Sequence, residues 1–326
     1  MMPRMLEVLV RGKVEMLRRD RRTWFTAVMV LLASLSLFPN ALPTVGQQPA
    51  TGDTVFVTFS VTDPYGRYVS GLRREYFSVS EQKESLDINY FSEEDKPASV
   101  AILFDLSDSM QGRPQVVAKA VNKFIQQSNK LDDYVIIGFN KQAQLVCDWG
   151  GSEDDILKAL SGIFKYKPNG PSAIYDAVNL SLKKMTSSPH SKRALLIVSD
   201  GNDTSSEITF KQLRRTLKES DVALYAVGVV NNAGSWLEME GQGVLDELAR
   251  VSGGRAFSAR SETEINDACE NIALELRHQY VIGISPTKVA LKDKWHDINI
   301  KLTLPKADFA KFPRLNVRSR GGYYLH

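Results

Sequence analysis

Three oxygen-bearing side chains stand at alternate positions directly after an apolar run. The run is Val100–Phe104, and Asp105, Ser107 and Ser109 follow it. A short, continuous apolar run is typical of a fully buried strand in a parallel sheet. Ligands of open α/β sheets bind just beyond the carboxyl ends of such strands. The Asp-x-Ser-x-Ser spacing therefore places a carboxylate and two hydroxyls where this architecture is expected to bind a ligand.

Two later stretches offer oxygen ligands of the same kind. Ala194–Ser199 is another apolar strand pattern and ends in Asp200, while Ser172 lies at the start of a helix predicted over 173–185. Partly neutral, all-oxygen ligation favours Mg2+, with Mn2+ and Ca2+ as alternatives. The predicted ligands of this one cation are Asp105, Ser107, Ser109, Ser172 and Asp200.

The three loops resemble the metal-ion-dependent adhesion site of von Willebrand factor A (VWA) domains. The resemblance rests on the motifs DLSDSM, GPSAIYDA and VSDG. It implies that the first Asp and the three Ser hydroxyls lie in or near the metal shell, and that Asp200 acts through water. It also implies a surrounding set of Asp108, Asp176 and Gly201. Two positions depart from the family pattern, since Ser172 replaces the usual Thr and Asp108 replaces a common Gly.

The charge of the chain is concentrated at its beginning. The 326 residues include 41 Lys and Arg and 38 Asp and Glu, a net charge of +3. Residues 1–22 hold seven basic and three acidic side chains, a balance of +4, so the remainder carries −1. Nothing in this balance favours nucleic acid as a partner.

Residues 1–50 have the order of a secretory signal, or of a signal anchor if they are not cleaved. Arginines precede the uncharged run Trp24–Phe38, and Pro39 and small residues follow. Fifteen residues are few for a membrane span. We therefore expect an exported protein, periplasmic, at the cell surface or secreted, that touches a membrane only through such an anchor. Cys147 and Cys269 are the only cysteines. The sequence leaves open whether they form a disulfide or remain two buried thiols.

Strands and helices alternate from residue 99 to about 278, which predicts a mostly parallel sheet covered on both faces. Consecutive strands at 134–139 and 143–147 place one antiparallel strand at an edge of that sheet. Further strands are predicted at 54–62, 76–80, 86–91, 279–285, 296–304 and 315–318. Because three-stranded sheets are marginal alone, the flanking strands are expected to pair as one β-sandwich.

The predicted fold is α/β, a doubly wound sheet of the VWA or Rossmann-like type inserted in a small β-sandwich. The predicted segments are a signal peptide or anchor over 1–50, sandwich strands over 51–96, a VWA domain over 97–278 and the remaining sandwich strands over 279–326. The layout is similar to that of the acidobacterial-type VWFA-related family over residues 54–324. This similarity predicts the fold and says little about the function.

The predicted function is metal-dependent, adhesion-type binding of a protein partner that presents an Asp or Glu to the cation. We expect no enzymatic activity, because the sequence contains no nucleophile constellation, Gly-rich phosphate loop or HExxH motif. Two alternatives stay open. One is a structural envelope component whose metal stabilises the fold. The other is a Mg2+-dependent hydrolase, which would need a general base and a second metal or basic clamp near Asp105.

Overall fold

The computed structural model describes residues 54–93, 95–230, 235–286, 294–305, 312 and 314–325. The predicted signal segment over 1–50 lies outside the described residues. Within the described ranges, no helix combines the length and the apolar character needed to cross a bilayer.

A six-stranded sheet forms the centre of the α/β unit, in the order β10-β9-β8-β5-β6-β7. Its strands are β5 (Ala98–Asp105), β6 (Asp133–Phe139), β7 (Ala143–Cys147), β8 (Lys192–Ser199), β9 (Ala223–Val229) and β10 (Arg255–Ala259). All neighbours pair in parallel except β6 and β7, which are antiparallel. The predicted mostly parallel sheet with one antiparallel edge strand is therefore confirmed.

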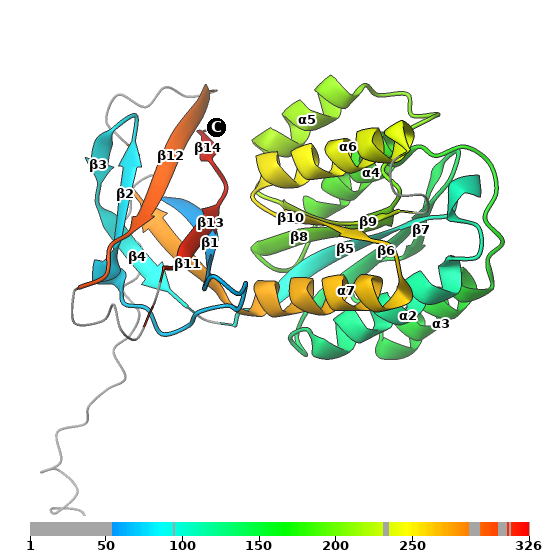
Figure 1. Cartoon of the computed structure of the whole chain (residues 1–326), viewed down its shortest axis with the longest axis horizontal. Coiled ribbons are helices and arrows are strands. Elements are labelled where there is room, and N and C mark those ends of the chain that lie inside the picture. The colour runs from blue at the N-terminus through cyan, green and yellow to red at the C-terminus, as the bar shows by residue number, and fades with distance from the viewer. Residues whose placement is uncertain are drawn as a thin grey trace, which may run out of the picture. The chain divides into compact units, whose positions relative to one another are not determined.

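Helices cover both faces of this sheet, which explains why every residue of β5 is buried. Figure 1 shows α4, α5 and α6 on one face and α2, α3 and α7 on the other. The helices are α2 (Pro114–Gln127), α3 (Glu153–Lys165), α4 (Ile174–Met185), α5 (Phe210–Glu219), α6 (Trp236–Ser252) and α7 (Glu262–Arg277). Side chains alternate along each strand between two separate apolar cores, one under each layer of helices.

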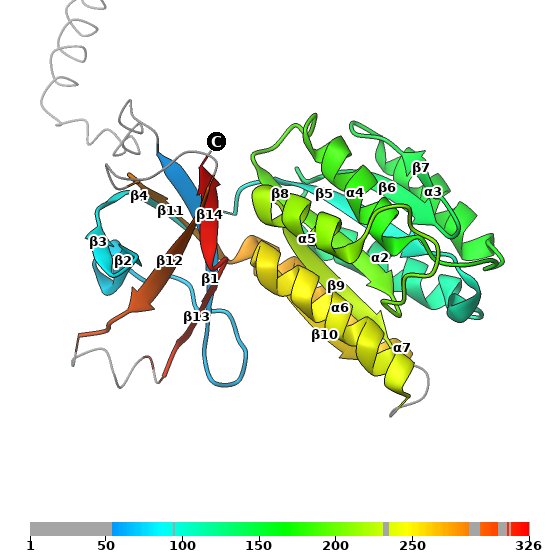
Figure 2. The same ribbon diagram turned by 90° about the horizontal axis from the view of Figure 1, so that it is seen from above.

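Two four-stranded antiparallel sheets form the flanking sandwich, in the orders β13-β1-β11-β4 and β14-β12-β2-β3. Their strands are β1 (Val55–Thr62), β2 (Phe77–Glu81), β3 (Glu84–Leu86), β4 (Ile88–Ser92), β11 (Gln279–Ile284), β12 (Lys294–Leu302), β13 (Asn316–Ser319) and β14 (Gly322–Leu325). Each sheet combines strands from both ends of the chain, and one apolar core lies between the sheets. Strands β12 and β14 run side by side in Figure 2. The predicted sandwich of flanking strands is thus confirmed.

Three local features differ from the predictions. The single strand predicted at 86–91 is wrong, because β3 ends at Leu86 and β4 begins at Ile88 in the other sheet. Leu86 and Ile88 both face the same core, so their alternation hides the change of sheet. Strand β14 and helix α3 were not predicted. The signal for α3 is a capping box, in which Ser152 Oγ accepts a hydrogen bond from the Asp155 amide.

Both cysteines are free and buried, so no disulfide joins Cys147 in β7 to Cys269 in α7. The thiol of Cys269 lies in the core beneath α7, and burial raises its pKa to about 12. The interpretation of two buried thiols, rather than a disulfide, is therefore correct.

Candidate metal centre

Asp105 is the last residue of β5, and the residue is 3% exposed. Its Oδ1 accepts hydrogen bonds from the Ser107 amide at 3.0 Å and the Ser107 hydroxyl at 2.6 Å. Its Oδ2 accepts from Ser199 Oγ at 2.5 Å and from Ser172 Oγ at 3.4 Å. Because β5 and β8 are parallel neighbours, their carboxyl ends meet at one edge and bring Ser199 to Asp105. Hydroxyls from two loops and from the end of β8 therefore converge on one buried carboxylate.

Ser107 and Ser109 lie on one side of a short turn. The 3-10 helix Asp108–Met110 follows Ser107, and the hydroxyl oxygens of Ser107 and Ser109 are 3.1 Å apart. The Asp108 amide donates to the Gly170 carbonyl at 2.9 Å, while the Asp108 side chain is exposed. This turn places the second and third predicted ligands together and ties their loop to the loop that carries Ser172.

The loop before α4 positions Ser172. The Ser172 amide donates to Thr204 Oγ1 at 2.8 Å, and the Ser172 carbonyl accepts from the Thr204 and Ser205 amides. The buried Ser172 side chain thereby faces Asp105 from a loop fixed on two sides. Sequence reasoning identified Ser172 but missed both Thr204 and Ser199. For Ser199 the available signal was its place directly before Asp200 at the end of a buried strand.

Asp200 follows β8 and is half-buried. Its Oδ1 accepts a hydrogen bond from the Asn202 amide at 3.1 Å, which shapes the turn after the strand. Its charge is close enough to raise the pKa of Asp105, although no hydrogen bond joins the two carboxylates in the described part of the chain. The structure therefore places Asp200 beside the convergent hydroxyls rather than among them.

The residues predicted around the ligands support the loops. Both carboxylate oxygens of Asp176 accept backbone hydrogen bonds, from Glu207 at 2.8 Å and from Ile208 at 3.2 Å. Gly201 has φ +83°, and a Cβ there would lie 2.2 Å from the Gly241 carbonyl oxygen of α6. Only glycine allows this close approach of the Asp200 loop to α6.

The electrostatics of the site favour a cation. Burial raises the pKa of Asp105 to about 6, against the lowering effect of the hydrogen bonds from Ser107 and Ser199, and the nearby Asp200 raises it further. None of the Lys, Arg or His side chains in the described ranges forms an ion pair with Asp105. A cation in this position would offset the cost of the buried charge.

The donor set suits a hard divalent ion, because every converging side-chain atom is a carboxylate or hydroxyl oxygen. Among the described residues, no group of three or more His, Cys, Asp or Glu side chains is placed to hold a metal ion. The centre is instead rich in neutral serine oxygens. Such ligation leaves much of the charge of a bound cation available to an incoming anion.

A family model for the von Willebrand factor type A domain matches residues 99–271, which are 173 of the 326 residues. The chain belongs to the VWA family. The matched segment begins within β5, ends within α7 and contains all five predicted ligands. The predicted family is confirmed by this match, whereas the roles of the individual site residues stay predictions.

Among curated proteins, an uncharacterized protein of Borreliella burgdorferi is 21% identical over 198 residues, which cover 54% of this chain and 58% of that protein. Among solved structures, BatB from Bacteroides thetaiotaomicron is 18% identical, with a TM-score of 0.42, and the match covers 54% of this chain and 97% of BatB. An aerotolerance-related membrane protein from Bacteroides fragilis is 19% identical, with a TM-score of 0.44 and coverage of 55% and 98%.

Proposed function

We propose that this VWA protein is an exported binding module that holds a divalent cation and uses it to capture an acidic residue of a partner protein. The supporting observation is the convergence of the Ser107, Ser172 and Ser199 hydroxyls on the buried Asp105 carboxylate. Asp105, Ser107, Ser109, Ser172 and Asp200 would hold Mg2+, with Mn2+ or Ca2+ as alternatives. The bound cation would supply a Lewis-acidic position that prefers a carboxylate to water.

The residues of the chain have two tasks in this proposal. Thr204 and Asp176 fix the loops that keep the hydroxyls oriented toward Asp105, and the hydroxyls themselves are neutral. Serine ligands leave the ion electrophilic. The negative charge that completes its coordination shell then comes from the acidic residue of the partner. VWA domains are generally interaction modules, and this chain is accordingly proposed to bind rather than to catalyse.

Calorimetry of the full chain with Mg2+ and Mn2+ tests the metal assignment. The wild type should bind, and saturating metal should raise the free energy of unfolding by RT ln(1 + [L]/Kd), about 2.7 kcal/mol at 100 times Kd. Asp105→Asn should abolish both effects because it removes the buried charge. Asp267→Asn, the same change at an exposed position of α7, should leave them intact. Equal binding by wild type and Asp105→Asn would reject the assignment.

A pull-down from envelope extract tests the binding function. A partner should be retained in Mg2+ and released by EDTA, and the Asp105→Asn protein should not retain it. Stabilisation by Mg2+ without any retained partner would favour the structural alternative. Phosphate-ester hydrolysis that requires Mg2+ and is lost in Asp105→Asn would favour the hydrolase.

A further inference from the structure

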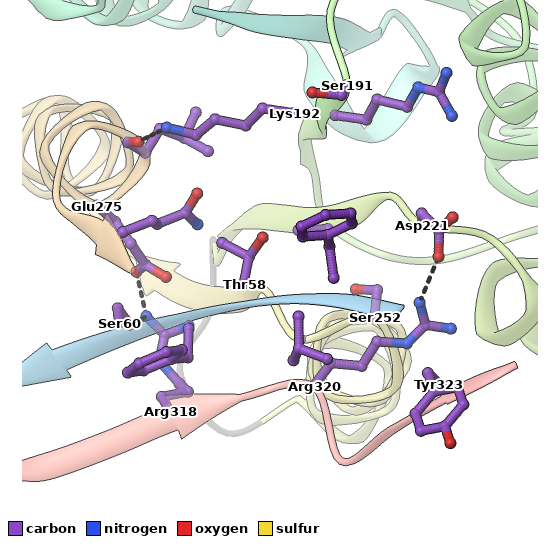
Figure 3. Close-up of a pocket in the computed structure, with 18 of the residues that line it drawn as sticks. Thr58, Ser60, Ser191, Lys192, Asp221, Ser252, Glu275, Arg318, Arg320 and Tyr323 are labelled. Atoms are coloured by element: carbon purple, nitrogen blue, oxygen red, sulfur yellow. Dashed lines mark hydrogen bonds and ion pairs between the residues drawn. The ribbon is translucent and has the colours of Figure 1, made fainter. Parts of the chain in front are cut away.

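A cavity of about 90 Å3 lies between the sandwich and the amino edge of the six-stranded sheet (Figure 3). On the sandwich side it is lined by β1, the first residue of β11, the end of β13, Arg320 and the start of β14. On the other side it is lined by the beginnings of β8 and β9 and by the ends of α6 and α7. Strand β8 separates the cavity from the candidate metal centre by eight residues, about 25 Å. The cavity is therefore a separate feature.

Positive charge exceeds negative charge around this cavity. The charged lining residues are Lys192, Arg193, Arg318 and Arg320 against Asp221 and Glu275. Glu275, which is 1% exposed, pairs with Arg318, so these two charges offset each other. Among the lining residues, three cations then remain against a single carboxylate, that of Asp221.

Asp221 neutralises Arg320 poorly. The Arg320 side chain is 12% exposed, whereas that of Asp221 is 79% exposed and its oxygen lies 3.4 Å from the guanidinium. Solvent screens such a pair strongly. The second terminal nitrogen of Arg320 donates to the Lys218 carbonyl, but its Nε is buried without a hydrogen-bond partner in the described part of the chain. A buried, unsatisfied donor of a charged group is costly and indicates an ion or water that would satisfy it.

A second cation adds to the charge beside Arg320. The Lys218 ammonium and the Arg320 guanidinium both lie over the ring of Trp295 in β12, at 4.0 Å and 5.0 Å from its centroid. Burial lowers the pKa of Lys218, and Arg320 is among the neighbouring cations that lower it further. Two like charges on one ring repel, and an anion bound to Arg320 in the cavity would relieve that repulsion.

Lys192 supplies positive charge on the opposite wall. Its ammonium donates to the Leu276 and Lys96 carbonyls. No carboxylate of the described chain forms an ion pair with it, although the charges of Asp132 and Asp95 are close enough to raise its pKa. Burial lowers its pKa to about 8. Thr58 and Ser191 add hydroxyls to the same lining, as Figure 3 shows.

We propose that this cavity binds a small oxyanion, an inorganic phosphate or sulfate or a single carboxylate group, with Arg320 as its principal partner. Arginine suits this task because its guanidinium is positively charged and its Nε–H still lacks an acceptor among the described residues. The cavity has the volume of about three water molecules, which admits one oxyanion and excludes a nucleotide. The bound anion joins the sandwich to the α/β unit and stabilises the pair.

Thermal unfolding of the full chain tests the proposal with three probes: sodium phosphate, sulfate and acetate, each at an ionic strength held constant with NaCl and in EDTA. The Tm should rise saturably by about 2–4 °C at ten times Kd with at least one probe. The phosphate and acetate arms distinguish a tetrahedral anion from a carboxylate. Because EDTA removes divalent cations, this result is independent of the proposed metal-dependent function.

Arg320→Gln should raise the Kd of the anion at least tenfold. Arg215→Gln, the same change at an exposed arginine of α5, should leave the Kd unchanged. If Arg320→Gln does not fold, the 31P line width of phosphate with the wild type gives the answer without a variant, because binding broadens the signal and sulfate reverses the broadening. A Tm rise identical in wild type and Arg320→Gln, or no effect beyond NaCl and no broadening, would show that the cavity holds water only.

Discussion

Two buried carboxylates, Asp105 and Glu275, lie near opposite edges of the same sheet and have opposite surroundings. Asp105 accepts hydrogen bonds from neutral donors, and no cation of the described chain pairs with it. Glu275 pairs with Arg318 of the sandwich and accepts hydrogen bonds from the hydroxyls of Tyr68 at 2.9 Å and Tyr225 at 3.0 Å. The protein itself supplies the counter-charge of Glu275, whereas Asp105 has the environment of a group that depends on an added cation.

The two ends of the parallel strands have different partners. We call the amino end, where Glu275 lies, the holding edge, and the carboxyl end, where Asp105 lies, the binding edge. Residues that meet Glu275 come from the sandwich and from β9, so the carboxylate joins elements far apart in the sequence. Residues that meet Asp105 come from the α/β unit alone, from two loops and the end of β8. In the proposed function the α/β unit binds its ligand at the carboxyl edge, whereas the amino edge contacts the sandwich.

The largest expected effect comes from breaking the holding edge. Glu275→Ala leaves the Arg318 guanidinium and two tyrosine hydroxyls without their partner, and the free energy of unfolding should fall by about 3–5 kcal/mol. Glu270→Ala, on the same helix, removes only an exposed pair with Lys123 and should cost less than about 1 kcal/mol. Urea unfolding measures both. Equal losses of unfolding free energy would show that the ion pair of Glu275 stabilises the protein no more than an exposed ion pair does.

A smaller effect is expected from distorting the binding edge. Gly201→Ala requires a left-handed backbone with a Cβ 2.2 Å from the Gly241 carbonyl, and should cost about 2 kcal/mol of unfolding free energy and weaken Mg2+ binding. Gly162→Ala is the matched control. Gly162 lies within α3 with open space around its Cβ position, so the change should stabilise by about 0.5–1 kcal/mol. Unaltered Mg2+ affinity in Gly201→Ala would separate the Asp200 loop from the metal.

The smallest effect per step is a pH dependence at the holding edge, at most about 1.4 kcal/mol for each pH unit. Burial lowers the pKa of Lys192 from 10.5 to about 8, against the raising influence of Asp132 and Asp95, while Arg277 lowers it further. Between these values the unfolded chain binds a proton that the folded chain has lost, so stability rises with pH in that window.

The measurement compares wild type with Lys192→Met in chloride buffer. From about pH 8 to pH 10, the wild type should gain stability relative to the variant, by at most about 1.4 kcal/mol per pH unit. Unfolding in urea at several pH values gives the difference, and tyrosine ionisation is common to both proteins. A difference that does not change with pH would mean that Lys192 is charged throughout this range.

Much of the α/β unit was predictable from its own residues. The apolar run before Asp105 predicted a strand buried on both faces, and the serines at alternate positions predicted hydroxyls at its carboxyl end. These inferences succeed because strand periodicity and strand-end placement are local properties, which a few consecutive residues carry. The same reasoning put Asp200 near Asp105, since parallel strands end at a common edge. Ser172 was assigned to the site from its place before a helix and from the resemblance to the VWA metal site.

Tertiary structure alone decided what each carboxylate meets. Ser199 donates to Asp105 because of the β5–β8 register, and Glu275 meets Arg318 only because the returning strands place β13 beside β1. Leu86 and Ile88 show the same limit, since one core accepts both and the alternation cannot reveal that they belong to different sheets. Periodicity reports which side of an element is buried, but the partner on that side depends on contacts between residues distant in the chain.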